Sequence, residues 1–466
     1  MSAVATREPT TVVHIVKGEA VFDAEVRYGT ATPFLTPRLD LDPLVWPRSE
    51  PGPAFNLPLD EILDVLVATG DRLTRDPDRL LMEALERSTA TNPLPRDILE
   101  RAYANLGAMF ARERLLFQIE QELGGRDVLD GWREVNTPSG RRCAIRACPA
   151  RMIHVIAGNA PGVAASTIMR SALTRGAALI KLPSNDLHTA PAVLRTMAQV
   201  APGHPLTRSF SAVYWRGGDA GVEAALFQPQ YFDKLIAWGG ESTIRSALKT
   251  IGPGLELISF DPKTSISLIG REAFESENTL LEAADRAAAD ATVFNQQACS
   301  SSRFQFVEGD TKQLRRFCEL LQQRMAAPRL TASNAPMHLP SDLRDEISAL
   351  RAMDDFYDVY GDEGGSGIVV RSDEPVGFQP DHKIVNVVGV QRLEDALDQI
   401  NVATQTVGIY PEQRKHALRD AIVYAGAQRV VSLGAAGVVD HGLPHDGFRP
   451  LDRLVRWVND EALPQS

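Results

Sequence analysis

The feature that most constrains the fold is an alternation of short apolar runs and helix-length segments over residues 152–269. The apolar runs are, in order, "MIHVIAG", "AALIKL", "SAVYW", "KLIAWGG" and "LELISF". Segments such as "GVAASTIMRSALTRG" and "STIRSALKTIG" separate them. Strands that alternate with helices form βαβ units, so this region predicts a parallel sheet covered by helices on both faces. We therefore expect an α/β protein.

A second region of similar character follows. A helix rich in alanine and acidic residues is predicted over about 277–293, and "RFQFVEG" is typical of a strand. The segments "KQLRRFCELLQQRM" and "LEDALDQINVA" both predict helices. Before the first region, residues 1–57 are rich in proline and predict an extended arm or strand pair. Residues 59–123 show helical spacing.

Composition narrows the functional class. The net charge of −11 over 466 residues argues against wholesale nucleic-acid binding. The four cysteines form no CxxC pair, which fits reduced thiols in the cytosol. The N-terminus has no apolar core of a secretory signal, and no run approaches the ~18 apolar residues of a membrane span. We expect a soluble, cytoplasmic protein with no membrane span.

One cysteine has unusual neighbours. Cys299 lies in "FNQQACSSSR", between amides and serines, whereas Cys318 lies on an apolar helical stripe and is expected to be structural. Cys143 and Cys148 have no histidine pair at metal-site spacing, so no metal site is expected. The local pattern alone leaves packing and catalysis open for Cys299.

Polar residues at strand ends also have two interpretations. Asn159 in "IAGNAPG" is either a turn and N-cap residue or an amide presented where open α/β sheets bind ligands. Lys181 ends a buried strand, either as a surface lysine or as a group that reaches an anionic ligand. The pair Gly239 and Gly240 suits close approach of a phosphate or ring, although strand-to-helix turns take glycine anyway.

Two common fingerprints are missing. No GxGxxG motif is present, because "RGGDAG" has the wrong spacing for dinucleotide binding. No GxSxG motif is present either, which argues against an α/β-hydrolase.

Taken in order, the motifs "GNAPG", "LIKLPSND", "AWGGES", "LELISFDPKTSISLIG", "FNQQACSSSR" and "PHDGFRPLDRLVRWV" resemble the aldehyde dehydrogenase superfamily. Within it they are similar to the LuxC-type acyl-CoA reductases. The resemblance covers about residue 130 to the C-terminus. It implies an aldehyde dehydrogenase-like α/β fold with a Rossmann-type cofactor domain, an α/β catalytic domain and a helical N-terminal region.

The resemblance also implies a division of the chain. Residues 1–130 would form an N-terminal arm and helices packed on the cofactor domain. Residues 131–270 would form the dinucleotide-binding domain and 271–435 the catalytic thiol domain. Residues 436–466 would form a C-terminal segment with a role in oligomerisation, and a homo-oligomer is expected.

Individual residues take roles from the same resemblance. Cys299 matches the catalytic cysteine and Asn159 the oxyanion asparagine. Lys181 matches the lysine that holds the adenosine ribose, while Gly240, with Gly239 beside it, matches the turn near the cofactor. In "PHDGF", by contrast, the residues are expected to form a structural turn outside the catalytic set.

Three departures from the superfamily pattern are informative. Aldehyde-oxidising members carry a deacylating glutamate where this chain has Ser259, which cannot act as that base; Glu256 lies nearby and could compensate. Ser184 replaces a glutamate that binds ribose hydroxyls, and this favours NADPH, with NADH as the alternative. The "EIFGP" segment is replaced by "QPDHKIVNVVGV", which leaves the nicotinamide-ribose contacts open.

The implied reaction is reduction of an acyl thioester to an aldehyde. Cys299 would attack an acyl-CoA or an acyl group carried by a partner protein, with a fatty acyl chain as the family expectation. The alternatives are an NAD(P)-dependent aldehyde dehydrogenase and a catalytically idle homologue that serves as an assembly subunit.

Overall fold

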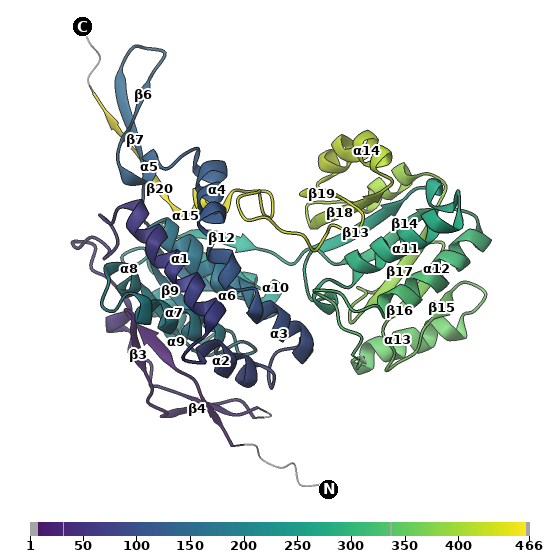
Figure 1. The fold of residues 1–466 in the computed structure, drawn as a ribbon, viewed down its shortest axis with the longest axis horizontal. Helices are drawn as coiled ribbons and strands as arrows, with labels where there is room; N and C mark the ends of the chain where they lie inside the picture. The colour runs from purple at the N-terminus through teal and green to yellow at the C-terminus, as the bar shows by residue number, and fades with distance from the viewer. Residues whose placement is uncertain (1–7, 31, 336–337, 463–466) are drawn as a thin grey trace. The chain divides into compact units, whose positions relative to one another are not determined.

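The protein divides into two compact units. The computed structural model describes residues 8–30, 32–335 and 338–462. The first unit comprises Met1–Pro93, Ala102–Asp261 and His441–Ser466, and the second comprises Leu94–Arg101 and Pro262–Asp440. Each unit is built around its own large sheet (Figure 1).

The sheet of the first unit has the strand order β12-β11-β8-β9-β10-β2-β3. The strands β8 to β12 run parallel, as the βαβ pattern predicts, while β2 and β3 add antiparallel strands beside β10. Their bounds are β2 His14–Val16, β3 Glu19–Val21, β8 Arg151–Val155, β9 Ala177–Lys181, β10 Phe210–Val213, β11 Lys234–Trp238 and β12 Glu256–Phe260.

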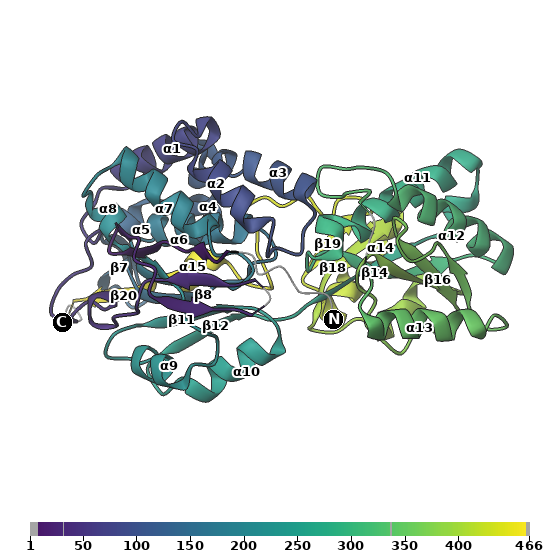
Figure 2. The same ribbon diagram turned by 90° about the horizontal axis from the view of Figure 1, so that it is seen from below.

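Helices cover both faces of this sheet (Figure 2). One face carries α1 Leu59–Arg75, α2 Leu80–Ser88, α4 Arg112–Leu123, α6 Gly162–Leu173 and α7 Thr189–Val200, and the other carries α9 Ala220–Leu226 and α10 Glu241–Thr250. Shorter helical elements of the unit are η1 Asp42–Leu44, η2 Gly107–Phe110, α5 Asp127–Asp130, α8 Pro205–Arg208 and α15 Pro450–Leu454. Apolar residues of β11 pack against Phe227 and Ile244 on the face of α9 and α10.

The second unit repeats the architecture with the strand order β15-β16-β17-β14-β13-β18-β19. All neighbours are parallel except β15 and β16. The strand bounds are β13 Thr264–Ile269, β14 Ser302–Glu308, β15 Asp358–Tyr360, β16 Ile368–Ser372, β17 Ile384–Val390, β18 Thr404–Tyr410 and β19 Arg429–Ser432.

Two apolar layers flank this second sheet. The alanine face of α11 (Glu277–Ala291) and the stripe of α12 (Thr311–Met325) share one core cluster, which includes the fully buried Cys318. The helices α13 (Ser341–Ala352) and α14 (Glu412–Ala425) contribute to separate clusters. The remaining elements are α3 Arg96–Ala104, η3 Arg271–Phe274, η4 Val293–Gln296 and η5 Leu393–Gln399.

Two small sheets complete the first unit. One has the order β1-β5-β4, with β1 Thr10–Thr11, β4 Val26–Tyr28 and β5 Phe34–Thr36. The other has the order β20-β7-β6, with β6 Arg133–Asn136, β7 Arg142–Cys148 and β20 Arg456–Glu461, and its β6–β7 hairpin projects from the unit (Figure 1). Cys143 and Cys148 both lie on β7 as free thiols.

The helices and strands expected from the sequence are present in the structure. The arm of residues 1–57 forms short strands where it is described, and residues 59–123 are helical. The helix expected over "LEDALDQINVA" is present as the 3₁₀ helix η5, and it is shorter than expected because it ends at Gln399 before an extended Ile400. Within residues 8–30, 32–335 and 338–462, no helix is both long and apolar enough to cross a bilayer.

Candidate active site

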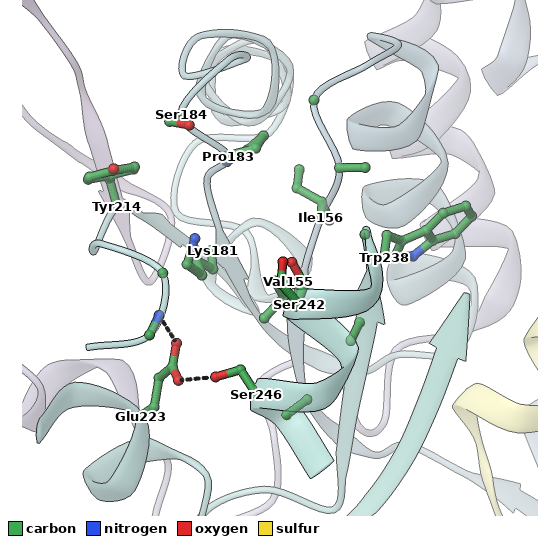
Figure 3. A pocket seen from close by; sticks show the side chains of 18 of the residues that line it. Val155, Ile156, Lys181, Pro183, Ser184, Tyr214, Glu223, Trp238, Ser242 and Ser246 are labelled. Carbon is green, nitrogen blue, oxygen red and sulfur yellow. Dashed lines mark hydrogen bonds between the residues drawn. The ribbon is translucent and has the colours of Figure 1, made fainter. Parts of the chain in front are cut away.

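A cavity of about 530 Å³ opens at the carboxyl ends of β8, β9 and β11 in the first unit. Its walls include Lys181 at the end of β9, with Ser184 after it, and Trp238 at the end of β11, with Gly239 after it (Figure 3). Open parallel sheets bind ligands outside the carboxyl ends of their strands, and the cavity falls within the usual range for small-molecule sites. The structure thus brings together three of the predicted cofactor residues, Lys181, Ser184 and Gly239.

Lys181 is a buried cation in this cavity. Its side chain is 8% exposed, and its ammonium lies 5.7 Å from the ring centroids of Tyr214 and Trp215. Burial lowers the pKa of Lys181 to about 8, against the opposing charge of Glu223. An ammonium in this environment is desolvated, so an anionic or hydroxyl-bearing ligand bound in the cavity would be favoured by contact with it.

Glu223 is the carboxylate that sequence reasoning missed. It extends from α9 into the cavity and is 6% exposed (Figure 3). The Gly218 N–H donates to its Oε1 at 2.9 Å, and the Ser246 hydroxyl donates to its Oε2 at 3.5 Å. A lone acidic residue in the apolar stretch "AGVEAALF" was the available signal.

The helix α10 begins at the rim of the cavity. Gly240 is its N-cap, as the glycine pair predicted, and Gly239 precedes it along the cavity wall. Ser242 and Thr243 of the first turn also line the cavity. A helix N-terminus presents unpaired N–H groups and a positive dipole end, so this rim is suited to a diphosphate.

Asn159 lies in the bend between β8 and α6 and is half-buried. It does not cap α6, because the N-cap is Pro161, which provides no side-chain hydrogen bond; the N-cap interpretation is therefore wrong. Close packing favours glycine at the neighbouring position 158, because a Cβ there would lie 2.2 Å from the Asn185 Oδ1. The Asn92 side-chain amide also donates to the Gly158 carbonyl at 2.8 Å.

Cys299 is an exposed cysteine of the second unit that forms no disulfide, and it lies in the turn that precedes β14. The preceding backbone is in the left-handed region at Phe294, Asn295 and Gln296, with φ of 48°, 47° and 70°. Such backbone in non-glycine residues costs energy and is characteristic of functional loops.

Side chains from several elements hold this turn. The Gln296 side-chain amide donates to the Ile384 carbonyl at 2.8 Å, and the Arg303 guanidinium donates to the Gln296 carbonyl at 3.0 Å. The Asn295 Oδ1 accepts from the Ser333 N–H at 2.9 Å. The turn that carries the thiol is therefore fixed by contacts on both sides.

The sulfur itself has a defined polar neighbour. The Gln405 side-chain amide, on the first residues of β18, donates to the Cys299 Sγ at 2.8 Å. The Ser265 hydroxyl donates to the Cys299 carbonyl at 2.8 Å and accepts from the Thr406 N–H at 3.1 Å. Sequence reasoning missed Gln405, because 106 residues separate the two side chains.

Glu256 is engaged elsewhere in the first unit. Its carboxylate accepts from Lys234 at 2.6 Å and from Arg453 at 2.7 Å. Burial raises the pKa of Glu256, but the hydrogen bonds from Lys234 and Arg453 outweigh burial and leave that pKa below its usual value. This carboxylate is an ion-pair partner, which argues against its use as a substitute base for Ser259.

The residues of "PHDGF" form a turn, as expected. The His445 N–H donates to the Phe448 carbonyl at 2.8 Å, and Asp446 and Gly447 adopt φ of 50° and 83°. The Phe448 ring lies 5.1 Å from the ring of Phe260.

Comparison with known proteins gives a family match over most of the chain. The family described as "Acyl-CoA reductase (LuxC)" matches residues 54–457. The long-chain acyl-protein thioester reductase of Aliivibrio fischeri is 30% identical over 426 residues, which cover 87% of this chain and 83% of that protein. The protein of the same name from Vibrio harveyi is 28% identical over 417 residues, again 87% and 83% of the two chains.

Solved structures resemble the whole fold. Lactaldehyde dehydrogenase from Escherichia coli matches with a TM-score of 0.71 at 15% identity, over 98% of this chain and 100% of that one. The NADP-dependent glyceraldehyde-3-phosphate dehydrogenase from Bacillus halodurans C-125, solved with NADP, matches with a TM-score of 0.69 at 13% identity, over 98% and 99%. The fold is therefore the aldehyde dehydrogenase-like α/β fold that the motifs predicted.

Proposed function

The chain belongs to the LuxC acyl-CoA reductase family, and from this premise we propose that it reduces an acyl thioester to the aldehyde through an acyl-enzyme on Cys299. The acyl donor is an acyl-CoA or an acyl group on a carrier protein, and the acyl group is fatty. The single observation that carries the proposal is an exposed thiol, in a turn held by side chains from other strands, within a chain of this family.

The residues of the cavity fit a dinucleotide, and we assign NADPH, with NADH as the alternative. Lys181 and Ser184 would hold the adenosine ribose and its 2′-phosphate, and the rim at Gly239 and Gly240 would receive the diphosphate. When bound, the cofactor supplies the hydride that reduces the acyl carbon. The buried cation of Lys181 and the hydroxyl donor of Ser184 support the assignment.

The protein's own part of the reaction centres on Cys299. Its thiolate attacks the thioester carbonyl, and the carrier thiol leaves to give a covalent acyl-enzyme, which divides one difficult step into two. We assign the oxyanion donors as the Asn159 side-chain amide and the Cys299 backbone N–H; loss of one such donor costs about 10²–10³ in rate. After reduction, the thiohemiacetal collapses to free aldehyde and Cys299.

The acyl group would be retained for reduction because neither Ser259 nor Glu256 is suited to act as the base for hydrolysis. Ser259 stands where aldehyde-oxidising members carry their glutamate, and Glu256 is held between Lys234 and Arg453. These features disfavour the alternative of an aldehyde dehydrogenase that releases a free acid. The presence of Cys299, Asn159 and Lys181 together disfavours the second alternative, a catalytically idle assembly subunit.

We also propose a homo-oligomer that uses the β20-β7-β6 sheet. Two large apolar side chains of this projecting sheet, Val135 at 36% and Trp457 at 40%, are exposed, as is Trp132 at 45%, directly before β6. Large apolar side chains that are exposed close together usually mark a surface that another protein chain covers. Light scattering should report a mass above one chain, and Trp457→Glu should reduce it; a monomeric wild type would contradict the proposal.

An acyl-CoA chain-length screen tests the proposed function. Purified protein is mixed with acyl-CoA of increasing chain length, and consumption of NADPH and NADH is followed together with aldehyde release. We expect cofactor consumption equal to aldehyde formed, greatest with long chains, and none in Cys299→Ala. Aldehyde oxidation without any acyl acceptor, with no thioester reduction, would instead favour the dehydrogenase.

A further inference from the structure

The contact between Gln405 and Cys299 places a fixed donor on the reacting sulfur. Gln405 is 5% exposed, and its Nε2 lies 2.8 Å from the Cys299 Sγ. The Thr406 hydroxyl donates to the Gln405 Oε1 at 3.2 Å, so the amide oxygen is held away from the sulfur. The donor is therefore oriented by its neighbour on β18 rather than free to turn.

We propose that Gln405 is a further catalytic residue, whose side-chain amide stabilises the Cys299 thiolate both as nucleophile and as leaving group. A hydrogen bond to the charged form of a group favours that form. An uncharged donor does so less strongly than a lysine or arginine in direct contact. This preserves nucleophilicity, which falls as a thiolate is stabilised further.

The same contact serves the last step. When the thiohemiacetal collapses, the bond between Cys299 Sγ and the reduced carbon breaks and its electron pair goes to sulfur. The hydroxyl proton is lost to solvent, and the carbonyl of the aldehyde forms. The Gln405 N–H receives the developing negative charge on sulfur, so the donor that assists attack also assists release.

The charged groups near the thiol are compatible with this role. Burial lowers the pKa of Arg429 on β19, and the negative charges of Asp290 and the Cys299 thiolate oppose that shift. The Arg429 guanidinium, however, donates to the carbonyls of Ala435 and Ala436, at 3.2 and 2.8 Å. Arg429 thus makes these hydrogen bonds to backbone carbonyls, while Gln405 makes the hydrogen bond to the sulfur.

The test measures thiol reactivity without substrate. The rate of iodoacetamide addition to the Cys299 peptide is followed by mass spectrometry from pH 5 to 10. The variants are Gln405→Met, which keeps the size and removes the donor, and Gln405→Glu, which places a negative charge beside the sulfur. Gln305→Met is the matched control, because Gln305 is also buried and donates from its amide to the Ala287 carbonyl at 3.1 Å.

We expect the midpoint of the pH–rate curve to rise by about one pH unit in Gln405→Met, which lowers the rate at pH 7 by about tenfold. Gln405→Glu should raise the midpoint further, and Gln305→Met should leave the midpoint unchanged. Thermal melts identify folded variants. Unshifted midpoints in folded Gln405→Met and Gln405→Glu would overturn the inference.

A turnover measurement adds a second readout. The catalytic role in turnover rests on the proposed reductase function, but thiol alkylation does not, so the two can fail separately. With an acyl-CoA and NADPH, Gln405→Met should lower kcat with little change in KM, and higher pH should restore most of the loss. A kcat loss that is equal at all pH values would contradict thiolate stabilisation.

Discussion

Lys181 and Glu223 carry opposite charges into one cavity, and among the described residues no ion pair within 4 Å joins them. The carboxylate of Glu223 raises the pKa of the Lys181 ammonium, although burial wins and leaves it at about 8. Lys181 is thereby kept cationic near neutral pH, where an anionic cofactor needs it.

The first prediction concerns the pH dependence of cofactor binding. Because the pKa of Lys181 is lowered to about 8, the ammonium is present below that pH and lost above it. The Kd for NADPH, measured by quenching of nucleotide fluorescence, should therefore rise as pH increases through about 8. Lys181→Arg should abolish this rise, because arginine stays charged. An equal pH dependence in Lys181→Arg would contradict the assignment.

The second prediction concerns Glu223. Its replacement by glutamine removes the charge that opposes desolvation of Lys181, so the pKa of Lys181 should fall below about 8. The rise in Kd for NADPH should then begin at lower pH than in the wild type. Glu120→Gln, on the exposed face of α4, is the control and should behave as wild type. A Glu223→Gln curve that superimposes on the wild type would remove Glu223 from this role.

The third prediction concerns cofactor choice. Ser184 lines the cavity and is exposed, so Ser184→Glu should be tolerated by the fold. The new carboxylate would repel a 2′-phosphate and accept from ribose hydroxyls, and should lower the ratio of kcat/KM for NADPH to that for NADH by about 10²-fold. Steady-state kinetics with both cofactors give this ratio. An unchanged ratio would place the 2′-phosphate elsewhere.

The fourth prediction concerns the oxyanion. Asn159→Ala should lower kcat for thioester reduction by about 10²–10³ while the Kd for NADPH stays near the wild-type value. Asn136→Ala, on the exposed strand β6, should leave both unchanged. A loss confined to cofactor binding would mean that Asn159 shapes the cavity instead of serving the reaction.

Features that depend on neighbouring residues in the chain could be predicted from the sequence, whereas features that depend on contacts between distant residues could not. The βαβ alternation identified β8 to β12 because hydrophobic periodicity is local. The three-residue strands β2 and β3 are too short to show a period, so their addition beside β10 was not predictable. The helix η5 was expected from its apolar spacing, but that spacing did not show that the helix is of the 3₁₀ type and ends at Gln399.

The residues of the candidate site likewise fall into those that the local sequence indicates and those that depend on distant partners. Lys181 and Gly240 stand at strand ends, and the polar run around Cys299 is visible in the sequence, so these residues were found. Glu223 and Gln405 were missed because their partners are distant in the chain. Cys299 precedes β14 and Gln405 lies on β18. The two side chains come together because only β13 separates these strands in the second sheet.

The account rests on covalent capture of the acyl group by one thiol. Intact-mass spectrometry after incubation with a long-chain acyl-CoA, without NADPH, tests this directly. We predict one added acyl group per chain, located on the Cys299 peptide, absent in Cys299→Ala and discharged as aldehyde when NADPH is added. A chain that stays unmodified, or an adduct that persists in Cys299→Ala, would contradict it.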